Sequence, residues 1–395
     1  MSPSHRSGEG NKLLMMPKFS IRRTAGFSLV EIMVGLAIGM LAVIVILQVF
    51  ALSEGRKRTT TSGGDAQSNG ALMIYQLQRD IGQAGYGFAA PSMFNCNVTW
   101  SVASGATIAT AVPLVPVTIN PATTIIPAGD LNTDRLLVMF GNGNGQPQGN
   151  TITAQASAVY TVQMPSSFTP GAVGVGDQVI AGPTPPATCG TLIVDRITAV
   201  TTNTVTTAVG SAGTILYNLG PSPTVRAYAV RGGNLTVCDY MLNDCGLDAN
   251  KGDPAIWVQI ASNIASLKAQ YARDTTATMD AIPDVFDQIT PGSAADTSGI
   301  PATCGWSRTS AIRIAVVACS SQFEKGLVTT TALNVGNPVN APTWDGNAGA
   351  PIVAATGMLG PDTVIDEPWK HYRYKVSQTV VPIRNVTWLG VPTGC

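Results

Sequence analysis

A single carboxylate close to the start of a long apolar stretch is the first residue whose chemistry needs an explanation. Glu31 follows Phe27–Val30 and precedes Ile32–Leu52, a run of 21 residues without a charged side chain. A lone carboxylate costs roughly 2.5–3.5 kcal/mol at the centre of a membrane helix and less near an end, so such a group usually has a positive partner. Cleavage between Gly26 and Phe27 would create one, because the new α-amino group would lie four residues before Glu31, about one helical turn away.

The apolar run is long enough to span a bilayer as one helix. Residues 1–26 carry five Lys and Arg side chains and one Glu, a net charge of 5 − 1 = +4, which favours a cytoplasmic N-terminus. An ordinary secretory signal has a shorter apolar region, although Ala51–Ser53 is compatible with signal cleavage. Gly35 and Gly39 form a G-x-x-x-G pair that lets helices approach closely in lipid, although glycine is also common in membrane helices.

The segment RRTAGFSLVEIMVGLAIGML, residues 22–41, resembles the leader junction of type IV prepilins and pseudopilins. The resemblance implies that a prepilin peptidase cuts after Gly26 and N-methylates Phe27. It also implies that Glu31 pairs with the N-terminus of a neighbouring subunit during assembly. Major pilins usually carry a helix-kinking proline where this chain has Gln48, and they are shorter, so the resemblance favours a minor pilin.

Later segments extend the resemblance to minor pilins of the PilW type. They occur in the order QRDIGQAGYGF, DRLLVMFG, VGDQVIAG, Ile256–Ala272, TSAIRIAVVAC and YRYKVSQTVVPIRN. The resemblance implies a structural subunit without catalysis or cofactor that helps to initiate or cap a type IV pilus. It would be a single-pass inner-membrane protein with a periplasmic C-terminal domain, and would later enter the extracellular pilus. The alternatives are a type II secretion pseudopilin of the J type and an adhesive binding module at the pilus tip.

The same resemblance implies a set of partners. These are other minor pilins, the major pilin, a pilus tip adhesin, the prepilin peptidase, the inner-membrane assembly platform and inner-membrane lipid. Nucleic acid is not expected as a partner, because the chain without residues 1–26 has 18 basic and 22 acidic side chains, a net charge of 18 − 22 = −4.

Composition and periodicity predict an α+β fold, in which a long N-terminal helix packs on an antiparallel, β-rich domain. Charged residues make up only 12% of the chain, and 41 Gly and 26 Pro favour short strands and turns. We expect a leader at 1–26, a helix at 27–84 whose residues 27–52 span the membrane, and a globular domain at 85–395. The helix should be soft near 59–64 and should bury Ala71, Ile74, Tyr75, Gln78 and Ile81.

The expected strands are bounded by Gly, Pro or Asn and rich in β-branched residues; they are 106–119, 134–140, 152–163, 176–181, 191–208, 225–230, 309–319 and 377–388. Residues 256–272 predict a strand followed by a short helix or by another strand. Residues 274–303 and 333–362 predict exposed loops.

Seven cysteines, an odd number, leave at least one without an intramolecular partner. No C-x-x-C occurs, so a metal site is not expected. Cys238 and Cys245 should close a local loop. If 309–319 pairs antiparallel with 377–388, Cys395 lies near Cys304. Cys96 with Cys189 is then the remaining pair, and Cys319 is the odd one.

Two further groups of side chains could carry chemistry. Four aspartates, Asp239, Asp244, Asp248 and Asp253, surround the Cys238–Cys245 loop, but their spacing does not match a calcium loop and predicts a solvated acidic turn. His371 is the one histidine outside residues 1–26, so any histidine general base would be this residue. A structural role is expected for it, because no nucleophile motif accompanies it.

Overall fold

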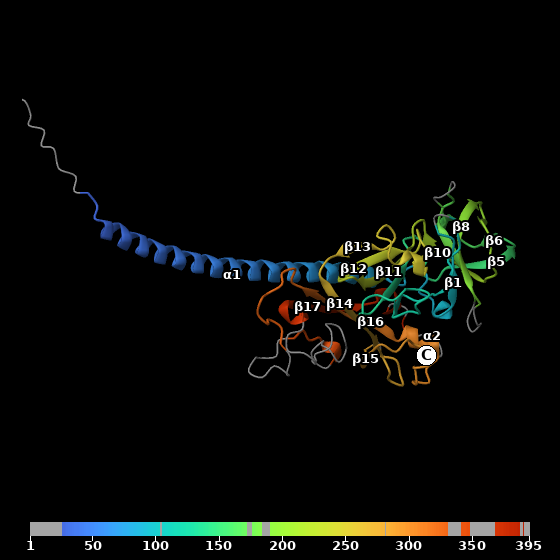
Figure 1. Ribbon diagram of the computed structural model, residues 1–395. Helices are drawn as coiled ribbons and strands as arrows, with labels where there is room; N and C mark the ends of the chain where they lie inside the picture. Colours follow the sequence, from blue (N-terminus) through green and yellow to red (C-terminus); the bar gives the residue numbers. More distant parts are fainter. Residues whose placement is uncertain are drawn as a thin grey trace, which may run out of the picture. The chain divides into compact units, whose positions relative to one another are not determined.

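The computed structural model describes residues 26–102, 105–171, 176–183, 190–280, 282–330, 341–347, 368–387 and 390, apart from the side chains of residues 58, 59 and 62. The chain divides into two compact units, Met1–Lys57 and Arg58–Cys395. Helix α1, Leu29–Gln83, contributes residues to both units. All described strands belong to the second unit (Figure 1).

Helix α1 is continuous over 55 residues, including Gly63 and Gly64, where the sequence analysis expected it to be soft. Its first part, Leu29–Lys57, is long and apolar enough to cross a membrane, and none of its most apolar window is buried inside the molecule. A cleaved signal sequence would pass the same test of length and composition. The structure therefore supports either an anchor or a signal at this position.

The largest sheet contains a closed barrel. The sheet has the order β2-β1-β8-β7-β10-β5-β6-β9, and an additional pairing of β8 with β9 closes a ring of six antiparallel strands. Strand β1 extends this sheet by pairing parallel to β8. The bounds are β1 Asn97–Thr99, β2 Val112–Pro113, β5 Asn150–Ala156, β6 Val159–Val162, β7 Gln178–Gly182, β8 Leu192–Val200, β9 Thr204–Thr207 and β10 Ile215–Gly220.

Two further sheets complete the second unit. The five-stranded sheet has the order β13-β12-β11-β4-β3, and the four-stranded sheet has the order β15-β14-β16-β17. Their strands are β3 Val117–Ile119, β4 Leu136–Phe140, β11 Thr224–Arg231, β12 Asn234–Asp239, β13 Val258–Ala261, β14 Ile264–Arg273, β15 Val285–Asp287, β16 Thr309–Cys319 and β17 Tyr374–Pro382. The short helices are α2 Ala302–Ser307 and α3 Arg384–Thr387, with 3-10 turns η1 Pro91–Met93, η2 Pro165–Ser167, η3 Asp248–Asn250, η4 Asp345–Asn347 and η5 Pro368–His371.

The second half of α1 packs in the main core, between residues of the five-stranded and four-stranded sheets. Its buried residues fall on one helix face, with a spacing of three or four residues; they are Ala66, Gly70, Met73, Leu77, Asp80 and Ile81, and Ala84, directly after the helix, is buried as well. The face predicted from the sequence is wrong except at Ile81 and the half-buried Ile74, since Ala71, Tyr75 and Gln78 are exposed. The predicted face was offset from the buried one, which carries Met73 and Leu77 together with Gly70 and with Asp80, whose carboxylate is bound by β11.

Contacts to distant parts of the chain end helix α1. Gly85 has φ +82°, a left-handed conformation that glycine adopts without strain, and its N–H donates to Met139 O over 2.9 Å. Asn385 Nδ2 donates to the carbonyl oxygens of Gln83 and Ala84, over 3.0 and 3.1 Å. The two bonds from Asn385 satisfy carbonyl groups at the C-terminal end of the helix, which its last turn leaves unpaired.

The coarse prediction of an α+β fold is confirmed, and several details are corrected. Residues 384–387 form α3 and not the end of a strand, and strands β1, β10 and β12 were missed. The predicted strands 106–119, 152–163 and 191–208 each divide into two shorter strands. The predicted loop at 274–303 contains β15 and the start of α2. Within 256–272 the alternative with a second strand is correct, since β13 is followed by β14. Most of the predicted loop at 333–362 lies outside the described residues.

Candidate functional site

The first candidate site is the start of the apolar helix. Helix α1 begins at Leu29, and the backbone N–H groups of Glu31 and Ile32 donate to Ser28 O. Glu31 therefore lies in the first helical turn, two residues after the helix begins, and its side chain is exposed. Phe27, 79% exposed, precedes the helix. Among the described residues of this chain, no cationic side chain forms an ion pair with Glu31.

The glycines of the G-x-x-x-G pair leave open space on the helix. An added Cβ at Gly35 or Gly39 would meet nothing within 4 Å. The two glycines lie on a shallow apolar groove whose other lining residues are Leu36, Met40, Val43 and Ile44. A glycine inside a helix lowers the stability of the helix by roughly 1 kcal/mol relative to alanine, so its presence usually has a packing reason. Packing among the described residues of this chain therefore does not require glycine at these two positions.

The second half of α1 carries a buried ionic cluster that the sequence analysis missed. Asp80 is 1% exposed, and its Oδ2 accepts hydrogen bonds from Arg226 Nη1 over 2.7 Å and from Tyr228 Oη over 2.5 Å. Both partners lie on β11. Burial alone lowers the pKa of Arg226, but the hydrogen bond and charge of Asp80 outweigh it and raise the pKa. Burial, and then the Asp80 carboxylate, raise the pKa of Tyr228 well above its ordinary value. The cluster joins the helix to the five-stranded sheet.

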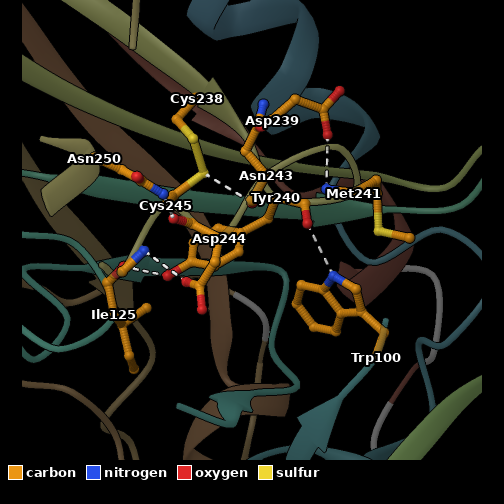
Figure 2. Close-up of a disulfide and its surroundings, with 11 residues drawn as sticks. Trp100, Ile125, Cys238, Asp239, Tyr240, Met241, Asn243, Asp244, Cys245 and Asn250 are labelled. Carbon is orange, nitrogen blue, oxygen red and sulfur yellow. Dashed lines mark hydrogen bonds between the residues drawn. A yellow bond between two sulfur atoms is a disulfide. The ribbon is translucent and has the colours of Figure 1, made fainter. Parts of the chain in front are cut away.

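The Cys238–Cys245 disulfide closes a loop at the end of β12, as shown in Figure 2. Its Cα atoms are 5.9 Å apart. The loop is held against the core because Trp100 Nε1 donates to Tyr240 O over 2.9 Å and the Tyr240 hydroxyl donates to Ile125 O. The two rings also meet edge to face. The disulfide therefore encloses a rigid, partly buried loop.

The aspartates around this loop accept hydrogen bonds from backbone N–H groups. Asp239 accepts from Met241 N, Asp253 from Ala255 N, and Asp244 from Gly246 N and from Ala109 N. Asp248 forms an ion pair with Lys251 at 2.9 Å. The described residues contain no group of three or more His, Cys, Asp or Glu side chains that could hold a metal ion. The arrangement stabilises turns. Asp248 and Asp253 are exposed, as a solvated acidic turn predicts, whereas Asp239 and Asp244 are half-buried.

The remaining cysteines differ in their bonding. Cys96 and Cys304 are each disulfide-bonded, and Cys319 is free. Cys189 and Cys395 lie outside the described residues, so the pairings Cys96–Cys189 and Cys304–Cys395 stay predictions. Strand β16, which ends at Cys319, does pair antiparallel with β17, the arrangement on which the second pairing depends.

Cys319 lies beside an open groove of about 850 Å³, which the sequence analysis did not predict. The groove is also lined by Asp130, Trp369, Tyr372 and Tyr374, among others. Burial raises the pKa of the Cys319 thiol, which disfavours the reactive thiolate. A catalytic role for this thiol therefore gains no support from its surroundings.

His371 lies on η5 in a buried setting. It is 7% exposed, its Nδ1 is 2.7 Å from Glu324 O, and its ring stacks on Phe323 with centroids 4.4 Å apart. A ring held by a backbone carbonyl and an aromatic neighbour packs the loop before β17. This environment fits the structural role expected for His371.

A comparison with known protein families finds a match in the C-terminal part of the chain. The family model of the Type IV Pilus-assembly protein W matches residues 229–385, which is 157 of 395 residues. The matched segment runs from β11 to α3 and includes the four-stranded sheet. No curated protein and no solved structure matches the chain.

The match supports a type IV pilus-related protein. The matched family is one of pilus assembly and not a known enzyme family. Within this class, the chain is similar over the matched segment to Type IV Pilus-assembly protein W. Neither the N-terminal junction nor the barrel lies in that segment.

Proposed function

We propose that this protein is a minor pilin, a structural subunit that helps to initiate or cap a type IV pilus after prepilin peptidase cleavage. The observation that carries the proposal is the exposed apolar helix that begins just after Gly26 and Phe27 and has Glu31 in its first turn. The pilus-assembly match at residues 229–385 also supports the proposal. This support is independent of the helix, because the matched segment does not include it. We assign no catalytic role and no cofactor to the protein.

Glu31 and the glycine pair support a role in which this helix packs against other helices. A carboxylate in apolar surroundings needs a positive partner, and the α-amino group of a neighbouring subunit has the right charge. Gly35 and Gly39 leave a groove in which a second helix could approach closely. The partners that follow are other minor pilins and the major pilin, with the prepilin peptidase and the assembly platform acting before assembly. The tip adhesin belongs to the same proposed set.

Intact mass spectrometry of the mature protein, purified from the membrane, tests the processing step. We expect an N-terminal Phe27 carrying one added methyl group. Gly26→Val should leave the full-length chain in the membrane, because the bond at this junction would no longer be cut. A mature chain that begins after Ser53 would instead show an ordinary secretory signal and would overturn the proposal. So would an assembled form that still begins at Met1.

Replacement of Glu31 tests the pairing step separately. Glu31→Ala removes the charge and makes the span more apolar, so the variant should still insert and still be cut after Gly26. Its recovery in sheared pili, relative to its membrane level, should fall by about tenfold or more, which corresponds to about 1.4 kcal/mol or more of lost interaction. Glu31→Asp keeps the charge but shortens the side chain, so an intermediate defect is expected. Equal recovery of Glu31→Ala and wild type at equal membrane level would refute the pairing role.

A further inference from the structure

Strand β17 forms an outer edge of the four-stranded sheet, because it pairs with β16 on one side only (Figure 1). It has nine residues, and its register with β16 is regular throughout. The strands at the other open edges, β2, β3, β13 and β15, have only two to four residues. Soluble proteins usually protect a sheet edge by a short strand, a bulge, a proline or a charged side chain. On β17, Lys375 and Pro382 lie near the two ends and leave the middle of the edge unprotected.

The hydrogen bonds that flank β17 show which of its backbone groups point away from β16. Ile383 N donates to Ser310 O over 2.9 Å, and Ser320 N donates to Arg373 O over 2.8 Å. In an antiparallel ladder, residues that bond to the neighbouring strand alternate with residues whose N–H and C=O groups point the other way. The odd-numbered residues of β17 therefore bond to β16. The residues that point outward are Tyr374, Val376, Gln378, Val380 and Pro382.

These outward groups form a regular row without a partner. The N–H groups of Tyr374, Val376, Gln378 and Val380 donate to no described residue. Pro382 has no N–H, and at an outward position its ring removes no bond to β16. Val380 is 44% exposed, so the edge is open to solvent. Donor and acceptor pairs thus repeat every second residue, about 6.8 Å apart, along the middle of the strand.

The spacing of this row indicates which kind of group would cover it. Another extended backbone carries donors and acceptors with the same repeat. A helix does not, because its backbone groups bond to one another, and a small ligand does not carry a row of such groups. The complementary occupant of the edge is therefore an extended peptide segment.

The groove beside Cys319 lies at the start of the same edge. Tyr374, the first residue of β17, lines it together with Trp369 and Tyr372. Leu131 also lines the groove and is 82% exposed. The volume of about 850 Å³ is ample for one large side chain. In strand addition the main-chain bonds give affinity, and pockets for side chains give specificity. The edge and the groove together fit one segment with an aromatic or large apolar side chain at the end next to Tyr374.

We infer that β17 is a strand-addition site, at which a partner chain supplies an extended segment that becomes the fifth strand of the sheet. An aromatic or large apolar side chain of that segment enters the groove. The segment has no proline at the positions that face β17, because a proline there would lack the N–H that the edge carbonyls accept. The partner is another subunit of the same filament, and in this respect the inference rests on the proposed function. The contact lies in the globular unit and is distinct from the contacts of the apolar helix.

A proline on β17 tests the inference in the full-length protein. Val380→Pro removes an outward N–H and no bond to β16, as the natural Pro382 does, so the variant should fold normally. In the docked state a partner carbonyl would lose its donor and meet the proline ring. Recovery in sheared pili, relative to the membrane level, should therefore fall by about tenfold or more. Val380→Thr has nearly the same shape and keeps the N–H, so it should match wild type. The melting temperature of both variants in detergent separates a loss of docking from a loss of folding.

Hydrogen exchange at the backbone amides tests the same site without a substitution. In the detergent-purified wild type, the amides of Val376, Gln378 and Val380 should exchange fast, whereas those of Ser377 and Thr379 should exchange slowly. In sheared pili the three outward amides should exchange about tenfold or more slowly than in the purified protein. Equal exchange in the two samples would overturn strand addition. Slow exchange of the outward amides in the purified protein would also overturn it, because a segment of this chain would then cover the edge.

A photo-crosslinking amino acid at position 380 identifies the segment. We expect an adduct with a peptide of another pilus subunit. Made synthetically, that peptide should bind the purified full-length protein, and N-methylation of its alternate residues should abolish binding. An adduct made only of two copies of this chain would overturn the inference. If wild type and Val380→Pro are recovered equally in sheared pili, the strand-addition site fails alone. If wild type itself is absent from sheared pili, the proposed function fails as well.

Discussion

Each half of helix α1 carries a carboxylate among apolar neighbours. The two carboxylates differ in burial and in whether a residue of the same chain binds them. Asp80 is buried and is bound by Arg226 and Tyr228 of the same chain. Glu31 is exposed, and no described residue of the chain pairs with it. Gly70 and Gly35, one in each half of the helix, differ in the same way in the space beside them. A Cβ at Gly70 would lie 2.9 Å from Ser377 Oγ, whereas one at Gly35 would meet nothing. The buried features of the second half of the helix find their partners within the chain, whereas those of the first half would find them in a second molecule under the proposed function.

The largest effect on the stability of the globular unit is expected from Asp80→Asn. The variant removes the negative charge and leaves the half-buried Arg226 without an ionic partner. We expect a loss of about 2–4 kcal/mol in the free energy of unfolding. Denaturant unfolding of the detergent-purified protein measures it. Glu31→Gln and the exposed Asp65→Asn are matched controls on the same helix, and both should leave this stability unchanged. If all three variants unfold alike, Asp80 does not anchor the helix and the contrast between the two halves fails.

A pair of glycine substitutions sharpens the same contrast. Gly70→Leu would force a large side chain between α1 and β17, where Ser377 and Ala318 lie within 4 Å of the added Cβ. We expect a destabilisation of about 1–3 kcal/mol, by the same unfolding measurement. Gly35→Leu should not change the stability of the globular unit, but should reduce recovery in sheared pili. A loss of stability at Gly35 as large as at Gly70 would contradict the assignment of Gly35 to contacts between molecules.

A smaller loss in the free energy of unfolding is expected from the substitution Tyr228→Phe and, in the wild type, from alkaline pH. The variant removes one hydrogen bond to a buried carboxylate, and we expect it to lower the free energy of unfolding by about 1.5–2 kcal/mol. In the wild type the raised pKa of Tyr228 means that the folded state keeps a phenol proton that the unfolded state releases above about pH 10. Tyr271, with its pKa raised to about 12, contributes in the same direction. Stability present below pH 10 should therefore fall as the pH rises further, and less steeply in Tyr228→Phe. Equal slopes for the two proteins would show that Tyr228 does not titrate as proposed.

Several parts of the globular unit were predictable because their signals are local. The alternation of Ile312, Ile314 and Val316 with smaller side chains gave β16 at 309–319, and its antiparallel pairing with β17 was also expected. Strands β10 and β12 were missed. The closure of the barrel depends on β10, which pairs with both β7 and β5. No short pattern in the sequence encodes a pairing between strands about 30 to 70 residues apart.

By itself, the sequence determined the features that depend on neighbouring residues: the basic side chains before Gly26, the place of Glu31 near the start of the apolar run, and the length of that run, which is that of a membrane helix. Their spacing along the chain is their spacing along the helix, so no tertiary contact is needed to infer them. The tertiary structure decided which face of the second half of α1 is buried. That face carries the apolar side chains of Met73, Leu77 and Ile81, and it also accommodates Asp80, through an ion pair with Arg226, 146 positions away. A buried aspartate is stable only when a partner reaches it, and that partner is fixed by the packing of β11 against the helix and not by the residues around Asp80.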